Sequence, residues 1–307
     1  MERYPRTMTE FQEQFQDEET CHKYFYELRW PDGFCCPRCG HTEAWKIERG
    51  LYLCSECRYQ ASLTAGTIFE GTHKPLCQWF QAIWHVTNQK HGVSALGLQR
   101  ALGLGSYHTA WTWLHKLRRA MVRPGRDRLS GRIQVDETFV GGVRSGAPGR
   151  GAAGKALVLV AAEEIEPDRI GRIRLLQIED ASMMTLHQGI FQCVVEGSAV
   201  CTDGWRGYNE LEGIGYDHEV VRSESDVGEQ LLPLAHRVAS LLKRWLLGTH
   251  QGAVRSSHLD YYLDEFTFRF NRRTSRSRGK LFYRLVQQAA TIDHMPVGKI
   301  KSRRALG

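Results

Sequence analysis

The chain has 307 residues, of which 42% are hydrophobic and 24% charged, so it is long enough for two or three domains of an ordinary globular protein. No apolar run approaches the roughly 20 residues that a membrane helix needs, and the N-terminus lacks a basic-then-apolar signal pattern, so we expect a cytoplasmic protein without a membrane partner. The net charge of +7 is uneven: from His236 onward there are 15 Lys and Arg against 4 Asp and Glu, which indicates either a polyanionic partner or a solvated charged face.

The N-terminal segment, residues 1–33, is predicted to be mainly one helix over 7–28. Thr7 and Glu10 have the spacing of a capping box, and apolar residues recur along one face. A Trp-Pro-Asp-Gly run ends the helix, because proline and glycine interrupt helical backbone. The next segment, 34–65, is rich in turn residues and holds five of the nine cysteines.

Four of these cysteines form two Cys-x-x-Cys pairs that are separated by 14 residues: Cys36, Cys39, Cys54 and Cys57. Zinc prefers four tetrahedral ligands, and two such pairs close a four-thiolate site that has no open coordination position. We therefore predict a structural zinc ribbon. A redox pair is the alternative, but it does not explain the second matched pair, and Cys35 is one residue out of register.

Residues 75–124 are predicted to be helical, with apolar side chains at helical spacing. Within them, 93–104, a turn at Gly105 and 106–121 have the pattern of a helix-turn-helix. Such a pair either places its second helix against DNA or packs on a neighbouring domain, and the sequence leaves both open. The run 123–127, which contains Pro and Gly, is the best linker candidate.

The pattern changes after Gly131 to a succession of strands and helices, which predicts an α/β domain over 130–292. The expected strands are 132–140, 157–165, 170–178 and 199–202, and the expected helices are 182–195, 231–247, 258–270 and 281–292. A basic tail, 293–307, ends the sequence.

Two aspartates stand in unusual places for charged residues. Asp136 lies inside the predicted strand 132–140, and Asp203 directly follows the predicted strand 199–202. A carboxylate inside a strand is costly unless it is paired or binds a metal. Two of them on neighbouring strands could hold Mg²⁺ ions that act on a phosphodiester. The alternative is that each aspartate caps a turn at a strand end.

His236 and Lys243 lie on the polar face of the predicted helix 231–247. They are about two helical turns apart and therefore point the same way. A histidine beside a lysine on such a face could serve a metal ion and a DNA phosphate. An ordinary pair of exposed side chains is the alternative.

Taken in order, these residues resemble the zinc-ribbon, ISXO-like group of insertion-sequence transposases, whose catalytic domains are of the DDE type. The resemblance rests on five stretches: 29–40, 135–142, 202–208, 236–246 and 265–273. It runs in order over nearly the whole chain, from about residue 8 to residue 290.

The resemblance implies a ribonuclease-H-like fold, with a mixed sheet flanked by helices. Asp136 and Asp203 match the first two acidic positions of the family, and Lys243 matches a lysine seven residues beyond the third. That third position is often Glu in related enzymes but is His236 here, which favours softer divalent ions than a carboxylate does. Glu229 is a fallback ligand. The implied cofactors are structural Zn²⁺ and catalytic Mg²⁺ or Mn²⁺.

The implied activity is that of a DNA transposase, which cleaves transposon ends and transfers the strands into target DNA. The implied partners are the terminal inverted repeats, target DNA and further copies of the chain, in a homo-dimer or larger complex that is nucleoid-associated in a prokaryotic cytoplasm. The residues expected to contact DNA are His108, Thr112, His115, Lys116, Arg244, Arg272, Arg273 and Arg276. The alternatives are a non-catalytic zinc-ribbon DNA-binding protein, such as a decayed or domesticated transposase, and a nuclease without strand transfer.

Two other signals are rejected. The glycine-rich run 149–156 nearly spells a phosphate-binding loop, but Ala156 lacks the hydroxyl that would bind Mg²⁺, and a predicted strand follows instead of a helix. We interpret 143–155 as a basic loop. Three further cysteines are expected to be core thiols rather than nucleophiles: Cys77, Cys193 and Cys201.

Overall fold

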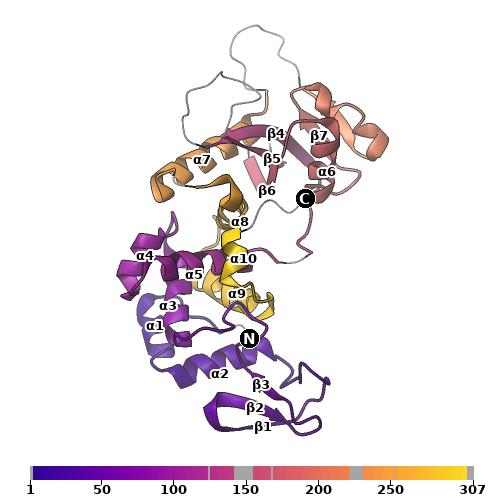
Figure 1. The fold of residues 1–307 in the computed structure, drawn as a ribbon. Coiled ribbons are helices and arrows are strands. Elements are labelled where there is room, and N and C mark those ends of the chain that lie inside the picture. The colour runs from indigo at the N-terminus through magenta and orange to yellow at the C-terminus, as the bar shows by residue number, and fades with distance from the viewer. Residues whose placement is uncertain are drawn as a thin grey trace. The chain divides into compact units, whose positions relative to one another are not determined.

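The computed structural model describes residues 3–123, 125–141, 155–166, 169–221, 231–252 and 254–302. It contains two compact units (Figure 1). One consists of Met1–Arg123 together with Ser275–Ser302, and the other of Pro124–Thr274. The first boundary coincides with the linker that the sequence predicts over 123–127.

The N-terminal unit begins with two helices, α1 (Met8–Gln14) and α2 (Glu18–Arg29), where the sequence predicts one. The first begins as expected, because the Thr7 hydroxyl accepts a hydrogen bond from the backbone of its first turn. The break follows from a second cap: Asp17 Oδ1 accepts from the N–H of Thr20 at 2.7 Å and so begins a new helix. The prediction of one continuous helix is therefore wrong.

The described part of this unit also contains α3 (Leu76–Asn88), α4 (Ala95–Leu102), α5 (Tyr107–Ala120), α9 (Arg278–Thr291) and α10 (Val297–Ser302). α9 packs against α2 and α3, and its Phe282 is buried among the rings of Phe11, Phe15 and Phe80. The sequence analysis instead placed 281–292 in the catalytic domain. The prediction and the structure differ because the apolar face of α9 packs into the aromatic core of the N-terminal helices, a contact between residues that are far apart in the sequence.

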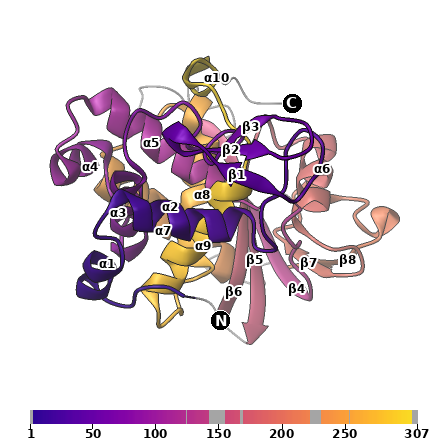
Figure 2. The ribbon, with the colours of Figure 1, turned by 90° about the horizontal axis from the view of Figure 1, so that it is seen from below.

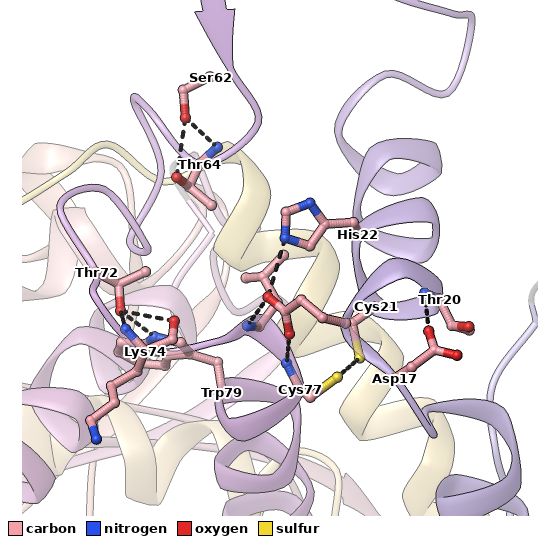
Figure 3. Close-up of polar contacts among 12 residues, drawn as sticks. Asp17, Thr20, Cys21, His22, Ser62, Thr64, Thr72, Lys74, Cys77 and Trp79 are labelled. Atoms are coloured by element: carbon pink, nitrogen blue, oxygen red, sulfur yellow. Dashed lines mark hydrogen bonds and ion pairs between the residues drawn. The ribbon is translucent and has the colours of Figure 1, made fainter. Parts of the chain in front are cut away.

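Side chains of α2 hold the start of α3. The helix begins after Pro75, which provides no side-chain cap. The Glu18 carboxylate instead accepts hydrogen bonds from the N–H groups of Leu76 and Cys77, at 2.6 and 2.9 Å. Close by on α2, Cys21 Sγ lies 2.7 Å from Cys77 Sγ (Figure 3). Helix capping therefore fixes α2 to α3 in addition to apolar packing.

A small antiparallel sheet follows α2, with strands β1 (Ala44–Lys46), β2 (Leu51–Cys54) and β3 (Gln60–Ser62) and a 3-10 turn at Glu48–Gly50. The sequence predicts only turns here, because strands of three or four residues are too short to show an alternation. The guanidinium of Arg29 ties this segment to α2 by donating to the backbone oxygens of Leu63 and Ala65.

The second unit is built around a five-stranded sheet that contains β4 (Arg132–Val140), β5 (Ala156–Glu166), β6 (Arg169–Ile178), β7 (Ala199–Thr202) and β8 (Asp217–Val220). The strand order is β6-β5-β4-β7-β8, which can be followed across the sheet in Figure 2. β5 is antiparallel to β4 and β6, whereas β7 is parallel to β4 and β8. This mixed sheet confirms the predicted α/β class and is consistent with a ribonuclease-H-like fold. The sequence analysis missed only the short β8 in this sheet.

Helices cover both faces of this sheet and divide its core in two. They are α6 (Met183–Cys193), α7 (Pro233–His250) and α8 (Leu259–Phe270), with 3-10 turns at Arg206–Tyr208, Glu212–Ile214 and Ser256–His258. α7 and α8 pack on the face that carries Val158 and Val160, and α6 packs on the face that carries Val135 and Leu159. No described helix combines the length and hydrophobicity that a membrane crossing requires.

Candidate active site and zinc site

The four cysteines of the predicted zinc ribbon form one cluster. The sulfur atoms of Cys36, Cys39, Cys54 and Cys57 all lie within 4.8 Å of one another. Two pairs, Cys36 with Cys57 and Cys39 with Cys54, are each 3.6 Å apart. Zinc–sulfur bonds of about 2.3 Å in a tetrahedron separate the sulfurs by about 3.8 Å. The cluster therefore fits one zinc ion and indicates a structural zinc site.

Each cysteine pair is followed by a residue in the left-handed conformation. Gly40 follows Cys39 at φ 76°, and Arg58 follows Cys57 at φ 57°. Glycine adopts this conformation without a steric penalty, whereas at Arg58 the fold imposes it on a residue that has a side chain. The same backbone turn after each pair directs its two sulfur atoms inward.

The remaining cysteines stand outside this cluster. Cys35 is exposed, which agrees with its being one residue out of register. Cys193 and Cys201 are buried in the two cores of the five-stranded sheet, as expected of core thiols. Cys77 is half-buried beside Cys21.

The two aspartates come from matching positions on adjacent parallel strands. In the register of β4 and β7, Gln134 pairs with Cys201. Asp136 lies two residues beyond Gln134 inside β4, and Asp203 lies two residues beyond Cys201, directly after the end of β7. Side chains alternate along a strand, and Val140, which has the same parity as Asp136, lies in the core beneath α7. The Asp136 carboxylate therefore points to the face of the sheet that α7 covers.

His236 meets Asp136 from α7. Its Nε2 atom lies 3.1 Å from Asp136 Oδ2, and the side chains of His236 and Asp136 are 44% and 17% exposed. Burial raises the pKa of Asp136 to about 6, and the nearby His236 imidazole opposes this shift. The negative charges of Glu137 and Asp203 contribute to the same raised pKa. Asp203 is therefore close enough to interact electrostatically with the pair.

The spacing of these groups suits divalent ions. Adjacent ligands of an octahedral Mg²⁺ at about 2.1 Å lie about 3 Å apart, close to the 3.1 Å between Asp136 Oδ2 and His236 Nε2. Asp203 stands further away: among the described residues, only the cysteine cluster brings three or more ligand atoms within 4.8 Å of one another. The Asp203 carboxylate is exposed and is held by the N–H of Trp205 at 2.9 Å.

The exposed face of α7 continues from His236 along the helix. Lys243 and Arg244, about two turns further on, are both exposed, and so is Arg237. The sequence-based placement of His236 and Lys243 on one polar face agrees with this arrangement. A row of cations that leads away from the Asp136–His236 pair suits the phosphate backbone of a nucleic acid.

The predicted helix-turn-helix corresponds to α4 and α5, which are joined through Gly103 in the left-handed conformation. Its proposed DNA contacts do not share one exposed face. His108 is exposed, whereas Thr112, His115 and Lys116 are buried. The Lys116 ammonium also bonds to a backbone oxygen. The structure therefore contradicts groove contact by these three side chains, because the fold turns that face of α5 inward.

Some residues of the basic run after α8 bond to the backbone of the sheet, and others are exposed on the surface. Asn271 accepts from the N–H of Ile173 at 2.8 Å and donates to its C=O at 3.1 Å, so it pairs with a residue of the edge strand β6. Arg273 donates to two further backbone oxygens of β6, and the Arg272 guanidinium lies 4.1 Å from the centre of a phenylalanine ring on α8. Arg276 is exposed. Arg273 thus helps to join the end of α8 to the sheet, whereas Arg272 packs on α8 itself.

One exposed feature of the zinc ribbon escaped the sequence analysis. Trp45 is 54% exposed, and the Arg58 guanidinium lies 5.7 Å from its ring centre. A lone tryptophan in a strand of three residues gives no periodic signal, so the sequence offers no means to single it out. The fallback ligand Glu229 lies outside the described residues, and so does the predicted basic loop at 143–155 except for its last residue, Lys155.

Two domain profiles match the chain. The profile of the transposase zinc-ribbon domain matches residues 16–60, which include α2 and the cysteine cluster. The profile of the ISXO2-like transposase domain matches residues 128–271, which include Asp136, Asp203 and His236. A zinc ribbon followed by an ISXO2-like transposase domain places the chain among the insertion-sequence transposases.

A relative extends the similarity over the rest of the chain. The "Uncharacterized protein in transposable element ISH50" of Halobacterium salinarum is 26% identical over 301 residues, which cover 90% of this chain and 98% of that protein. The chain belongs to the family of zinc-ribbon, ISXO2-like insertion-sequence transposases.

Proposed function

We propose that the chain is a catalytically active DNA transposase that cuts transposon ends and joins them to target DNA with divalent ions. The observation that carries this proposal is the contact of His236 with Asp136, near Asp203 and just beyond the last paired residues of β4 and β7. Family membership supports the class of reaction, and these side chains supply the groups that the reaction needs.

Asp136, Asp203 and His236 would hold Mg²⁺ or Mn²⁺. Such ions, when bound, activate a water or a 3′-hydroxyl and stabilise the leaving oxygen of a phosphodiester. The donor set fits this role, because carboxylate oxygens suit both ions. The imidazole nitrogen shifts the preference toward Mn²⁺. The ribbon cysteines would hold Zn²⁺ in a closed site, so that ion stabilises structure and takes no part in the reaction.

The proposed reaction consists of two displacements at phosphorus. First, water attacks a phosphate at the transposon end, the bond from phosphorus to the 3′-oxygen breaks, and the released 3′-oxygen takes up the proton that water loses. Second, this 3′-hydroxyl attacks a target phosphodiester and replaces the target's 3′-oxygen on phosphorus, while its proton passes to that oxygen. Both are in-line substitutions and can therefore use the same carboxylates and imidazole.

DNA would be held by cations on α7 and by the zinc ribbon. Lys243 and Arg244 are exposed along the helix that carries the imidazole, and Arg276 is exposed after α8; such side chains contact phosphates and give binding without sequence preference. Trp45 with Arg58 offers an exposed aromatic and a cation on the ribbon. We therefore propose the ribbon as a separate DNA-binding surface.

The test uses the full chain and a duplex that carries the inverted repeats flanking its gene, with Mg²⁺ or Mn²⁺ added. We expect the wild type to cut and join this DNA. Asp136→Asn and Asp203→Asn should bind the duplex as the wild type does but cut it more than about 100-fold more slowly. Asp217→Asn is the matched control, because Asp217 pairs with Ala199 at the far end of β7 from the site and should leave cutting unchanged.

The other outcomes identify the alternatives. Binding without cutting in any divalent ion would indicate a non-catalytic DNA-binding protein, which is the alternative that His236 in the place of a glutamate favours. Cutting without joining would indicate a nuclease. Normal cutting by Asp136→Asn would exclude this site as the centre of the reaction.

A further inference from the structure

We propose that Gln134 is a positioning residue that sets His236 against Asp136 by capping the start of α7. Gln134 lies on β4, two residues before Asp136, and is not one of the proposed metal ligands. The capping contacts are observed directly, whereas their consequence for catalysis rests on the proposed function.

The N–H groups at the start of α7 depend on this one side chain. The residue that precedes the helix provides no side-chain cap, and the first helical residue, Pro233, has no N–H. The N–H groups of Leu234 and Ala235 both donate to Gln134 Oε1, at 2.9 and 3.4 Å. The N–H of His236 is already bonded within the helix, at 3.0 Å. A single amide oxygen from β4 therefore supplies the cap.

The cap links the two elements that form the site. Gln134 and Asp136 point to the same face of β4, because they are two residues apart on one strand. On α7, the capped N–H groups belong to the two residues that directly precede His236. A rotation or shift of this turn would move the imidazole away from its 3.1 Å contact with Asp136. The strand that carries the carboxylate therefore also positions the helix that carries the imidazole.

Burial makes the Gln134 oxygen hard to replace. Gln134 is 8% exposed, and Leu234 and Ala235 are buried with it. Water cannot readily reach N–H groups in such a position, so their loss of a partner is more costly than at an exposed helix end. Another side chain of β4, Thr138, is also buried, lies on the same face and is two residues beyond Asp136. Thr138 therefore offers a matched control.

The test compares variants of the full chain by amide hydrogen exchange, which does not depend on activity. Gln134→Met keeps the volume but removes the acceptor, Gln134→Glu keeps an acceptor, and Thr138→Val is the control. In Gln134→Met we expect exchange at the Leu234 and Ala235 amides to become at least about tenfold faster. In the other two variants we expect exchange at the wild-type rate.

Mn²⁺ titration and cleavage kinetics measure the consequence for the site. In Gln134→Met, the Mn²⁺ dissociation constant should rise and kcat should fall, each by about 10- to 100-fold. The KM for DNA should stay at its wild-type value, because the DNA-binding cations are not disturbed. Thr138→Val should leave the Mn²⁺ dissociation constant, kcat and KM unchanged. A merely structural loss would instead lower the fraction of folded protein without this split between kcat and KM.

Wild-type exchange at both amides in Gln134→Met would overturn the capping role. Faster exchange with unchanged Mn²⁺ affinity and kcat would overturn the positioning role, and weaker Mn²⁺ binding with unchanged exchange would make Gln134 a metal ligand instead. If Gln134→Met does not fold, Gln134→Asn, which withdraws the oxygen by one methylene, carries the same expectations. If the wild type cuts no DNA, the proposed function fails, while the exchange comparison still decides whether Gln134 holds α7.

Discussion

His236 Nε2 lies 3.1 Å from Asp136 Oδ2, so an imidazole and a carboxylate are close enough to bind one metal ion together. Imidazole is preferred by softer divalent ions, and carboxylate oxygen by harder ones. The imidazole also brings no negative charge beside the largely buried Asp136 carboxylate. We therefore expect the side chain at position 236 to set the choice of metal ion.

Replacing His236 should change the metal preference in a predictable direction. His236→Glu is expected to raise cleavage in Mg²⁺ relative to cleavage in Mn²⁺ by about tenfold or more, because all ligands then become oxygens. His236→Ala should slow cleavage in both ions. The measurement is the cleavage rate at saturating concentrations of each ion. Wild-type rates in His236→Ala would contradict a ligand role for the imidazole.

Protons should compete with divalent ions at Asp136. Burial raises the pKa of this carboxyl to about 6. Below that pH we expect the apparent Mn²⁺ affinity to fall by about tenfold per pH unit, as calorimetric titration can measure. Asp203→Asn should move the whole profile to lower pH, because the charge of Asp203 contributes to the raised pKa. An affinity that does not change across this range would contradict the prediction.

The same pKa shift has the opposite effect on the stability of the chain without Mg²⁺ or Mn²⁺. A carboxyl whose folded-state pKa lies above its ordinary value of 3.8 favours the folded state when it is protonated. Its contribution is therefore complete below about pH 3.8 and is lost as the pH rises through about 6. Asp136→Asn, which does not ionise, should lack this part of the pH dependence in thermal unfolding.

Zinc content should distinguish a ligand from its neighbour in the sequence. Cys36→Ser is expected to lower the zinc content from about one ion per chain to less than half of that, because it removes one of four thiolates. Cys35→Ser, which changes a cysteine outside the cluster, should keep its zinc. Mass spectrometry of the native protein measures both. Equal zinc contents in the two variants would rule out the assigned ligand set.

Two arginines that look equivalent in the sequence should behave differently. Arg244→Gln, on the exposed face of α7, should weaken DNA binding and reduce its salt dependence by about one counterion, with unchanged stability. Arg273→Gln loses hydrogen bonds to the backbone of β6 and should lower the free energy of unfolding by about 1–2 kcal/mol. Anisotropy titrations at several salt concentrations and urea unfolding measure the two effects. Lower stability in Arg244→Gln together with weaker DNA binding in Arg273→Gln would contradict both assignments.

Several elements were predictable because their signals are local. The alternation over 132–140 marks β4, and the buried run at 199–202 marks β7. Asp136 and Asp203 stand out against these runs, because a charge is unexpected in an apolar strand. The zinc ligands are equally local, since each Cys-x-x-Cys turn brings two sulfurs to one ion.

Other features were beyond reach of the sequence because they depend on partners that are distant along the chain. By helical spacing, Thr112 and Lys116 belong to a polar face of α5, yet the fold buries both side chains. Arg273 is part of a basic run, yet it bonds to the edge strand of the sheet. α9 has an ordinary apolar stripe, and nothing in that stripe says which core it joins.

By itself, the sequence determined the four cysteines of the zinc ribbon and the strands and helix on or beside which Asp136, Asp203 and His236 lie, because periodicity and spacing act over a few residues. Only the tertiary structure decided that His236 contacts Asp136. It also decided that the Gln134 oxygen caps the start of α7, the helix that carries His236. The physical reason is that strand register and helix capping across the sheet join residues that no local pattern connects.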